Sequence, residues 1–487
     1  MMNYVSFVFY VFLILLTAVY YILPLNFRWL VLLAGSGFFY YFTIYRRMQL
    51  VIFAMSIGIS YLFGILIQHL RTRQWKPGWK QLILITGIVL SVFPLFGSKC
   101  TDFFLGCIVH KQKFPWIIPV GLSFYSLQII AYLTDIYKGR IDCQRNPFKY
   151  ALFISFFPHI IQGPIPRYQQ LEKQLFCGHR YDSDKFMKGI QLIIWGFFLK
   201  YMIANKASVI VDTVFNNHMT YQGLYVAVAG VLYSFQLYTD FLSCVTISQG
   251  VSQLFGICLT DNFNHPYFSV SVKEFWRRWH ISLSHWLRDY IYIPLGGNRG
   301  GRLCKYRNLV LTFVVSGIWH GASWKFLFWG LMHGGYQIAG GLTHDLQEKI
   351  YGFLQMPPGS RLRRLFQQLV TFCLITAAWI IFRADSLKTG IKMIRSLFTF
   401  RNPWILFDNS IFRLGLNQKE CEVLGLSLLL LLFVSILQER GIVLRNWFVR
   451  QCLPVRWSIY LCAVCGIWVL GTYGFGFDAN DFIYGGF

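Results

Sequence analysis

Long apolar runs dominate this chain and predict membrane-spanning helices. Hydrophobic residues make up 55% of its 487 residues and charged residues only 13%, which is more apolar surface than a soluble core of this length hides. A full span needs about 20 apolar residues, so we expect the shorter runs to be tilted or re-entrant. We therefore predict an all-α polytopic membrane protein. The clearest runs are Val5–Leu23, Trp29–Tyr45, Leu50–Leu70, Leu82–Leu95 and Ile459–Gly471.

One segment, Glu274–Gly297, breaks the apolar pattern with the sequence EFWRRWHISLSHWLRDYIYIPLGG. It carries Arg277, Arg278, Arg288 and Asp289 among tryptophans. An ionised side chain at the centre of a bilayer costs roughly 2.5 to 3.5 kcal/mol. We therefore expect this segment to lie at the membrane interface or in a water-accessible cavity. Either placement makes it a candidate functional segment.

Positive charge is gathered in short loops between the apolar runs. The net charge of +25 does not indicate nucleic-acid binding, because this clustering is the positive-inside pattern of membrane proteins. If the three basic loops are cytoplasmic, both termini lie outside the cytoplasm, although Arg46 and Arg47 do not fit this scheme. The first apolar run lacks a basic n-region and is expected to be retained rather than cleaved. The loops contain Arg71, Arg73, Lys76 and Lys80, then Lys138, Arg140, Arg145 and Lys149, and finally Arg445, Arg450 and Arg456.

A polar, turn-rich stretch at Thr343–Arg364 suggests a division of the chain. We expect a membrane bundle at residues 1–345, with a catalytic core at about 100–345, and further transmembrane helices and a tail at 346–487. The twelve cysteines are scattered and are interpreted as small buried hydrophobes. Cys462 and Cys465 form a CxxC within an apolar run, and we interpret them as helix packing rather than a metal or redox site.

Two histidines are the strongest candidates for chemistry. His320 in GIWHG follows an apolar run, where loss of hydration favours the neutral imidazole that a general base requires. The alternative is a histidine bonded to a neighbouring helix carbonyl. Trp276, His280 and Ser284 recur every four residues and are expected to share one helix face. An interfacial helix anchored by tryptophan and arginine is the alternative there.

Three further segments carry weaker signals. Ser123, Gln128 and Asp135 punctuate the apolar run after Pro119, although the position of Asp135 at its end favours a structural role, as a helix cap or a partner of Lys138. The prolines and glycine of FFPHIIQGPIPR, residues 156–167, predict a re-entrant segment lining a cavity. The tail DFIYGGF, with Tyr484, is expected to be frayed or docked at the interface.

Several blocks together resemble the membrane-bound O-acyltransferase family, in particular its bacterial branch of alginate O-acetyltransferases and teichoic acid D-alanyl transferases. The resemblance is best over residues 100–345. The blocks read PVGLSFYSLQIIAYLTDIYKG, FFPHIIQGPIPR, YSFQLYTDF, DNFNHPYFSVSVKEFWRRWHISLSHWLRDYIYIPLGGN and GIWHGASWKFLFWGLMHG.

The resemblance implies a ring of helices around a central tunnel, with re-entrant and interfacial helices, a cytoplasmic funnel for the acyl donor and an outer funnel for the acceptor. It implies that His320 is the essential histidine, that His280 is the second active-site histidine, and that Tyr484 in the FxYxxF tail carries the acyl group onward. The implied donor is acetyl-CoA or an acyl carrier protein thioester, with no bound cofactor or metal. An extracytoplasmic SGNH-type transferase is the implied partner.

The expected function is O-acylation of an extracytoplasmic polysaccharide by an enzyme of the bacterial cell membrane. D-alanyl transfer to teichoic acid remains open within the same chemistry. From a different class, a transporter or flippase for a lipid-linked sugar also suits the broken segment around Pro158–Pro166. The histidines within their flanking motifs favour the enzyme.

Overall fold

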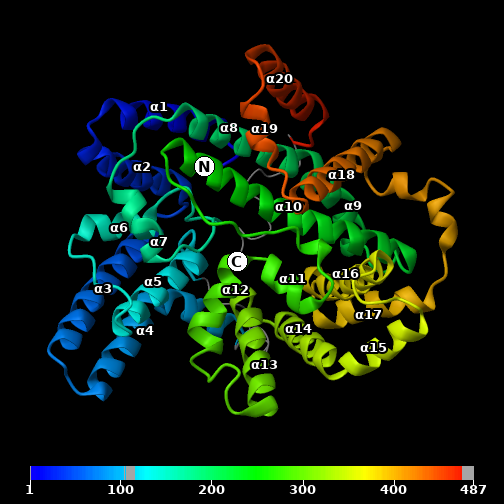
Figure 1. Cartoon of the computed structure of the whole chain (residues 1–487), viewed down its shortest axis with the longest axis horizontal. Helices are drawn as coiled ribbons and strands as arrows, with labels where there is room; N and C mark the ends of the chain where they lie inside the picture. Colours follow the sequence, from blue (N-terminus) through cyan, green and yellow to red (C-terminus); the bar gives the residue numbers. More distant parts are fainter. Residues whose placement is uncertain (1, 104, 106–115, 474–487) are drawn as a thin grey trace. The chain divides into compact units, whose positions relative to one another are not determined.

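The computed structural model describes residues 2–103, 105 and 116–473, and the described residues form helices, turns and irregular segments without a strand (Figure 1). They fall into two compact units. The first contains the chain up to Phe197 together with Ser243–Thr260. The second contains Phe198–Leu242 together with the described chain from Asp261 onward.

The first unit contains the N-terminal helices packed around an aromatic core. Its helices are α1 (Phe7–Ile22), α2 (Arg28–Thr43), α3 (Arg47–Thr72), α4 (Pro77–Asp102), α5 (Leu122–Tyr137), α6 (Pro147–Ser155), α7 (Tyr168–Phe176) and nearly all of α8 (Ser183–Phe198), with a 3₁₀ turn η1 (Leu25–Phe27). Helix α4 packs against both α3 and α5, and α2 packs against α6. Phe9, Phe39 and Phe157 are fully buried and their rings contact one another.

The second unit begins with a π-helix, η3 (Leu199–Ala204), and α9 (Asn205–Asn216). It continues with the first part of α10 (Leu224–Leu254), η4 (Pro266–Phe268), α11 (Val272–Arg278), α12 (Ile281–Leu287) and the π-helix η5 (Arg288–Tyr292). The chain then forms α13 (Gly301–His320), α14 (Trp324–Leu342), α15 (His344–Phe353), α16 (Arg361–Arg383), α17 (Leu387–Thr399), η6 (Pro403–Leu406), η7 (Ser410–Arg413), α18 (Gln418–Glu439), α19 (Leu444–Val449) and α20 (Leu453–Leu470).

Among the described residues, seven helices are long and apolar enough to cross a membrane, which confirms a polytopic membrane protein. The predicted runs correspond to α1, α2, α3, α4 and α20, and α4 is longer than the run from which it was predicted, at 26 residues. The seven candidate spans are Arg47–Thr72, Pro77–Leu95, Ser183–Asn216, Leu224–Leu254, Arg361–Arg383, Gln418–Glu439 and Leu453–Leu470.

Two of the predicted basic loops meet at one end of the first unit. Arg71, at the end of α3, donates hydrogen bonds to the carbonyls of Ile136 and Ile141 at 2.9 and 3.0 Å and pairs with Asp142. Hydrogen bonds from Gln68 and Arg71 lower the pKa of the Asp142 carboxyl. The loops after α3 and α5 therefore lie at the same end of the first unit, as their expected placement on one side of the membrane requires.

The interpretation of the cysteines as buried small hydrophobes is wrong for most of them. Of the ten cysteines that the structure describes, Cys244 is buried and six are exposed. Cys462 and Cys465 are among the exposed ones, on α20, where none of the apolar window is buried by protein. Their CxxC is therefore not helix packing. The physical reason is that lipid is as apolar as a protein core, so apolar side chains of a span need no protein partner.

Candidate active site

The segment that carries His280 is a broken helix rather than a continuous one. Helix α11 ends at Arg278, Trp279 is extended, and His280 is left-handed at φ 45° and ψ 55° before α12 begins at Ile281. The prediction that Trp276, His280 and Ser284 share one helix face is therefore wrong. Periodicity assumes an uninterrupted helix, and the left-handed residue turns the chain away from that register.

Asn262 holds the break in place. Its backbone carbonyl accepts from the N–H of Ile281 at 2.9 Å, and its side-chain oxygen accepts from the N–H of Ser282 at 3.0 Å. The left-handed conformation costs roughly 1 to 2 kcal/mol for a non-glycine residue and persists where the surroundings over-determine it. Asn262 is 1% exposed, so this support comes from inside the unit.

His280 lies in an aromatic environment within the second unit. Its ring meets Phe241 edge-on at 4.8 Å and Trp319 at 6.2 Å, and the residue is 1% exposed. Neither ring nitrogen has a hydrogen-bond partner among the residues that the structure describes. A buried polar group without a protein partner is a place for an ordered water or a substrate atom.

His320 is the last residue of α13 and is enclosed by aromatic rings. Its ring lies 4.8 Å from Trp319, 5.2 Å from Trp329 and 5.5 Å from Phe382. Gly317, one turn earlier, allows α13 to approach α14 closely, because a Cβ there would lie 2.3 Å from the carbonyl oxygen of Phe326. The tight helix pair thus places His320 against the rings of α14.

Trp319 connects the two histidines that the sequence singled out. Its indole lies 6.2 Å from the ring of His280 and 4.8 Å from the ring of His320. The structure therefore brings both to one aromatic cluster of the second unit, although they are 40 residues apart in the chain. Two buried imidazoles around one apolar cluster form an arrangement suited to moving a proton out of contact with bulk water.

The arginines of the same segment lie outside this cluster. Arg277 and Arg288 are exposed, and Arg278 pairs with Glu274 and with Glu439 of α18. The tryptophans, in contrast, are buried. The charges of this segment therefore lie at the surface of the protein or in ion pairs, and the tryptophans pack the segment against its unit.

Sequence reasoning missed two features near the histidines. His333, on α14 and fully buried, accepts a hydrogen bond from the indole N–H of Trp276. Lys200, in the π-helix η3, forms a buried ion pair with Asp240 at 2.6 Å. Asp240 precedes Phe241, whose ring contacts His280. The signal for each was present, since an ionisable residue within an apolar run is a functional hypothesis by default.

The weaker candidates belong to the first unit or lie outside the described residues. Asp135 pairs with Arg140 at 3.1 Å, which supports the interpretation of this carboxylate as structural. The chain after α6 is irregular, with His159 2% exposed and Gln162 fully buried, and the cavity that this segment was expected to line stays a prediction. Tyr484 and the rest of the tail lie outside the described residues.

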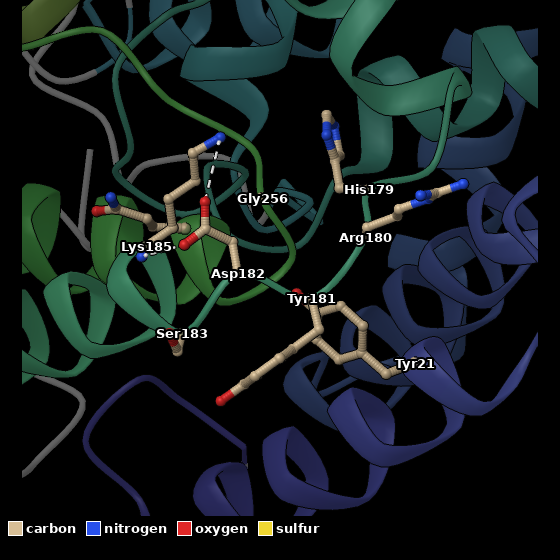
Figure 2. Close-up of a pocket in the computed structure, with 9 residues that line it drawn as sticks. Tyr21, His179, Arg180, Tyr181, Asp182, Ser183, Lys185 and Gly256 are labelled. Carbon is tan, nitrogen blue, oxygen red and sulfur yellow. Dashed lines mark hydrogen bonds and ion pairs between the residues drawn. The ribbon is translucent and has the colours of Figure 1, made fainter.

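A separate polar pocket of about 490 Å³ lies in the first unit, where α1 ends and α8 begins (Figure 2). Lys185 pairs loosely with Asp182 at 3.9 Å, and Arg180 points away from both. The pocket contains none of the residues that the sequence singled out. It is lined by Tyr21, His179, Arg180, Tyr181, Asp182, Ser183, Lys185, Gln253 and Gly256.

No group of three or more His, Cys, Asp or Glu side chains within the described ranges is arranged to hold a metal ion.

Comparison with known proteins adds an independent finding. The model of the membrane-bound O-acyltransferase family matches residues 144–383, which include His280, His320 and His333. The chain is 34% identical over 435 residues to the probable alginate O-acetylase of Azotobacter vinelandii, covering 88% of this chain and 82% of that protein. It is 33% identical over 405 residues to the peptidoglycan O-acetyltransferase of Helicobacter pylori, covering 76% and 73%. It is also 31% identical over 258 residues to the teichoic acid D-alanyltransferase of Bacillus subtilis, covering 50% and 65%.

Proposed function

This chain belongs to the membrane-bound O-acyltransferase family, and on that premise we propose that it transfers an acetyl group from a cytoplasmic thioester to hydroxyl groups of an extracytoplasmic polysaccharide. The names of the alginate and peptidoglycan relatives favour acetyl over D-alanyl. D-alanyl transfer to teichoic acid is the second candidate, because a teichoic acid D-alanyltransferase matches half of the chain.

The observation that carries this proposal is the pair of buried histidines against Trp319. His320 is the general base. The hydroxyl oxygen attacks the thioester carbonyl carbon while His320 takes the hydroxyl proton. The carbon–sulfur bond then breaks, and the proton passes to the departing thiolate, so that the products are an ester and a free thiol. Such base catalysis contributes roughly 10²- to 10⁴-fold in rate.

His280 stabilises the oxyanion that forms on the thioester carbonyl, or orients the acceptor hydroxyl. Its two ring nitrogens have no partner among the described residues, so either one is free to bond to a reacting group. A hydrogen-bond donor aimed at developing charge in a water-excluded site is a large contributor to catalysis, about 10²- to 10³-fold for one donor. The aromatic rings around His280 exclude water in this way.

Tyr484 is proposed as the onward carrier of the acyl group. In this scheme its phenol oxygen is the hydroxyl that first receives the acetyl group, and an extracytoplasmic SGNH-type transferase then moves it to the polysaccharide. The scheme needs the C-terminal tail outside the cytoplasm, together with the N-terminus, as the positive-inside pattern predicts. The scheme also needs a tunnel enclosed by a ring of helices. This tunnel would join the cytoplasmic face, where acetyl-CoA or an acyl carrier protein binds, to the extracytoplasmic face.

The replacement His320→Ala tests the chemistry. Membranes containing the variant are incubated with labelled acetyl-CoA, and the label transferred to polymer is measured. We expect transfer to fall by about 10²-fold or more, with unchanged expression and an unchanged elution profile in detergent. His344→Ala is the matched control, since His344 is exposed at the start of α15. Normal acetylation of the cell-envelope glycans by the His320 variant would refute the assignment.

The replacement Tyr484→Phe tests the carrier role separately. It removes one phenol oxygen and leaves the ring, so we expect hydrolysis of the donor to persist while transfer to polymer is lost. Full transfer by this variant contradicts the carrier role and leaves the role of His320 intact.

A further inference from the structure

A third histidine, His333, is buried in the same aromatic cluster. It lies on α14 and its ring centre is 4.8 Å from that of Trp329, and the ring of Trp329 also lies 5.2 Å from that of His320. The ring of Trp276 stands perpendicular to that of His333 at 5.0 Å. One indole therefore separates His333 from His320, and another joins it to the helix that precedes His280.

The hydrogen bond between Trp276 and His333 determines the protonation of the histidine. The indole Nε1 lies 3.1 Å from Nδ1 of His333. An indole N–H only donates, so Nδ1 must accept and carries no proton. A protonated imidazole has no acceptor, and the bond therefore requires the neutral ring with its hydrogen on Nε2. That Nε2–H has no hydrogen-bond partner among the residues that the structure describes.

This bond spans two separately built parts of the site. Trp276 belongs to α11, whose last residue lies two positions before His280. Gly330 allows α14 to pack closely against α13, because a Cβ at this position would lie 2.4 Å from the carbonyl oxygen of Phe313. Because α13 ends at His320, movement of α14 is transmitted to that histidine.

We propose that His333 is a positioning residue for acyl transfer. It accepts from Trp276 and packs on Trp329, and in this way it holds the chain bearing His280 in register with the helix pair bearing His320. This inference rests on the proposed catalytic function of His280 and His320. His333 itself acts through the two indoles and takes no proton from the substrate.

Two amide replacements separate this role from direct contact with substrate. The side-chain oxygen of Asn occupies the position of Nδ1 and is able to accept from Trp276, whereas the amide of Gln reaches the position of Nε2. We expect His333→Asn to keep kcat within about tenfold of the natural protein. We expect His333→Gln and Trp276→Phe each to lower kcat by about 10- to 100-fold with little change in KM for the donor, because a 1 Å misplacement costs up to about 10²-fold.

The double variant Trp276→Phe with His333→Gln provides the coupling test. If the two residues act through their bond, the double variant is no worse than the more damaged single variant. The proposal is overturned if the losses multiply, or if His333→Gln stays active while His333→Asn does not, since that pattern assigns the function to Nε2.

A measurement without catalysis keeps the inference separate from the proposed function. In protein labelled with ¹⁵N in the histidine rings, the His333 signal is identified by its absence in His333→Asn. We expect an unprotonated Nδ1 and a protonated Nε2 between pH 6 and 8, and a change of this pattern in Trp276→Phe. An unchanged pattern in Trp276→Phe refutes the bond, whereas full activity of His320→Ala refutes the proposed function and leaves the bond in place.

Discussion

The contact between α13 and α14 provides the sharpest prediction about the site. Gly317 of α13 faces the backbone of α14, and a Cβ at this position would lie 2.3 Å from the carbonyl oxygen of Phe326. Ordinary van der Waals contact begins at 3.4 Å, so Gly317→Ala requires the helices to separate by about 1 Å. The neighbouring atom belongs to the backbone, so no flexible side chain is available to absorb the change.

The magnitude follows from this geometry. Insertion of a methyl group into a tightly packed interface costs about 1 to 3 kcal/mol, so we expect the free energy of unfolding to fall by that amount. The effect on activity is larger. His320 lies one turn beyond Gly317 and contacts Trp329 across the same interface. A displacement of about 1 Å between a base and its substrate costs up to about 10²-fold in rate.

Gly335→Ala is the matched control. Gly335 lies in α14, and nothing stands within 4 Å of a Cβ built there. Replacing a helical glycine by alanine stabilises by roughly 0.5 to 1 kcal/mol where space permits. Thermal unfolding in detergent, followed by tryptophan fluorescence, and acyl transfer from labelled donor are measured for both variants. If Gly317→Ala is as stable and as active as Gly335→Ala, the inferred close packing of α13 against α14 is wrong.

Three further predictions follow from the described contacts. Lys200→Met leaves the buried Asp240 without its cation and should destabilise the protein by about 3 to 5 kcal/mol, whereas the double variant Lys200→Met with Asp240→Leu should recover most of that loss in thermal unfolding. His280→Gly and His280→Ala should both lose acyl transfer, but the glycine variant should unfold at the higher temperature, because φ is 45° at this position and only glycine adopts it without strain. Asp142→Asn should lower the thermal midpoint slightly at pH 7. Since the pKa of Asp142 is lowered in the folded protein, its contribution exists above the unfolded pKa and disappears as pH falls through the folded pKa, so the two proteins should converge in acid.

The sequence was sufficient for the class of protein and for two of the three clustered histidines. The apolar runs predicted α1, α2, α3, α4 and α20 because a span needs a length of apolar sequence whatever its neighbours are. His280 and His320 stood out because polar groups are rare in such runs. Membership of the family is supported independently by the similarity of the chain to known acyltransferases.

The interruption at His280 was beyond sequence reasoning. The four-residue spacing of Trp276, His280 and Ser284 is a helical pattern, yet Asn262, which lies 20 residues before Ser282, accepts hydrogen bonds from the two residues after His280. The sequence does not show which segment will be close enough to provide such bonds. The exposed cysteines of α20 illustrate a different limit, because apolarity alone does not distinguish burial in protein from contact with lipid.

Local composition therefore determined that this chain crosses a membrane and which histidines are candidates for chemistry, since hydropathy and side-chain chemistry belong to each residue by itself. Only the tertiary structure decided that His280, His320 and His333 meet around Trp319, Trp329 and Trp276. That meeting depends on close backbone approach at Gly317 and Gly330 and on a left-handed residue between two short helices. These are relations between separate helices and turns, and packing determines them.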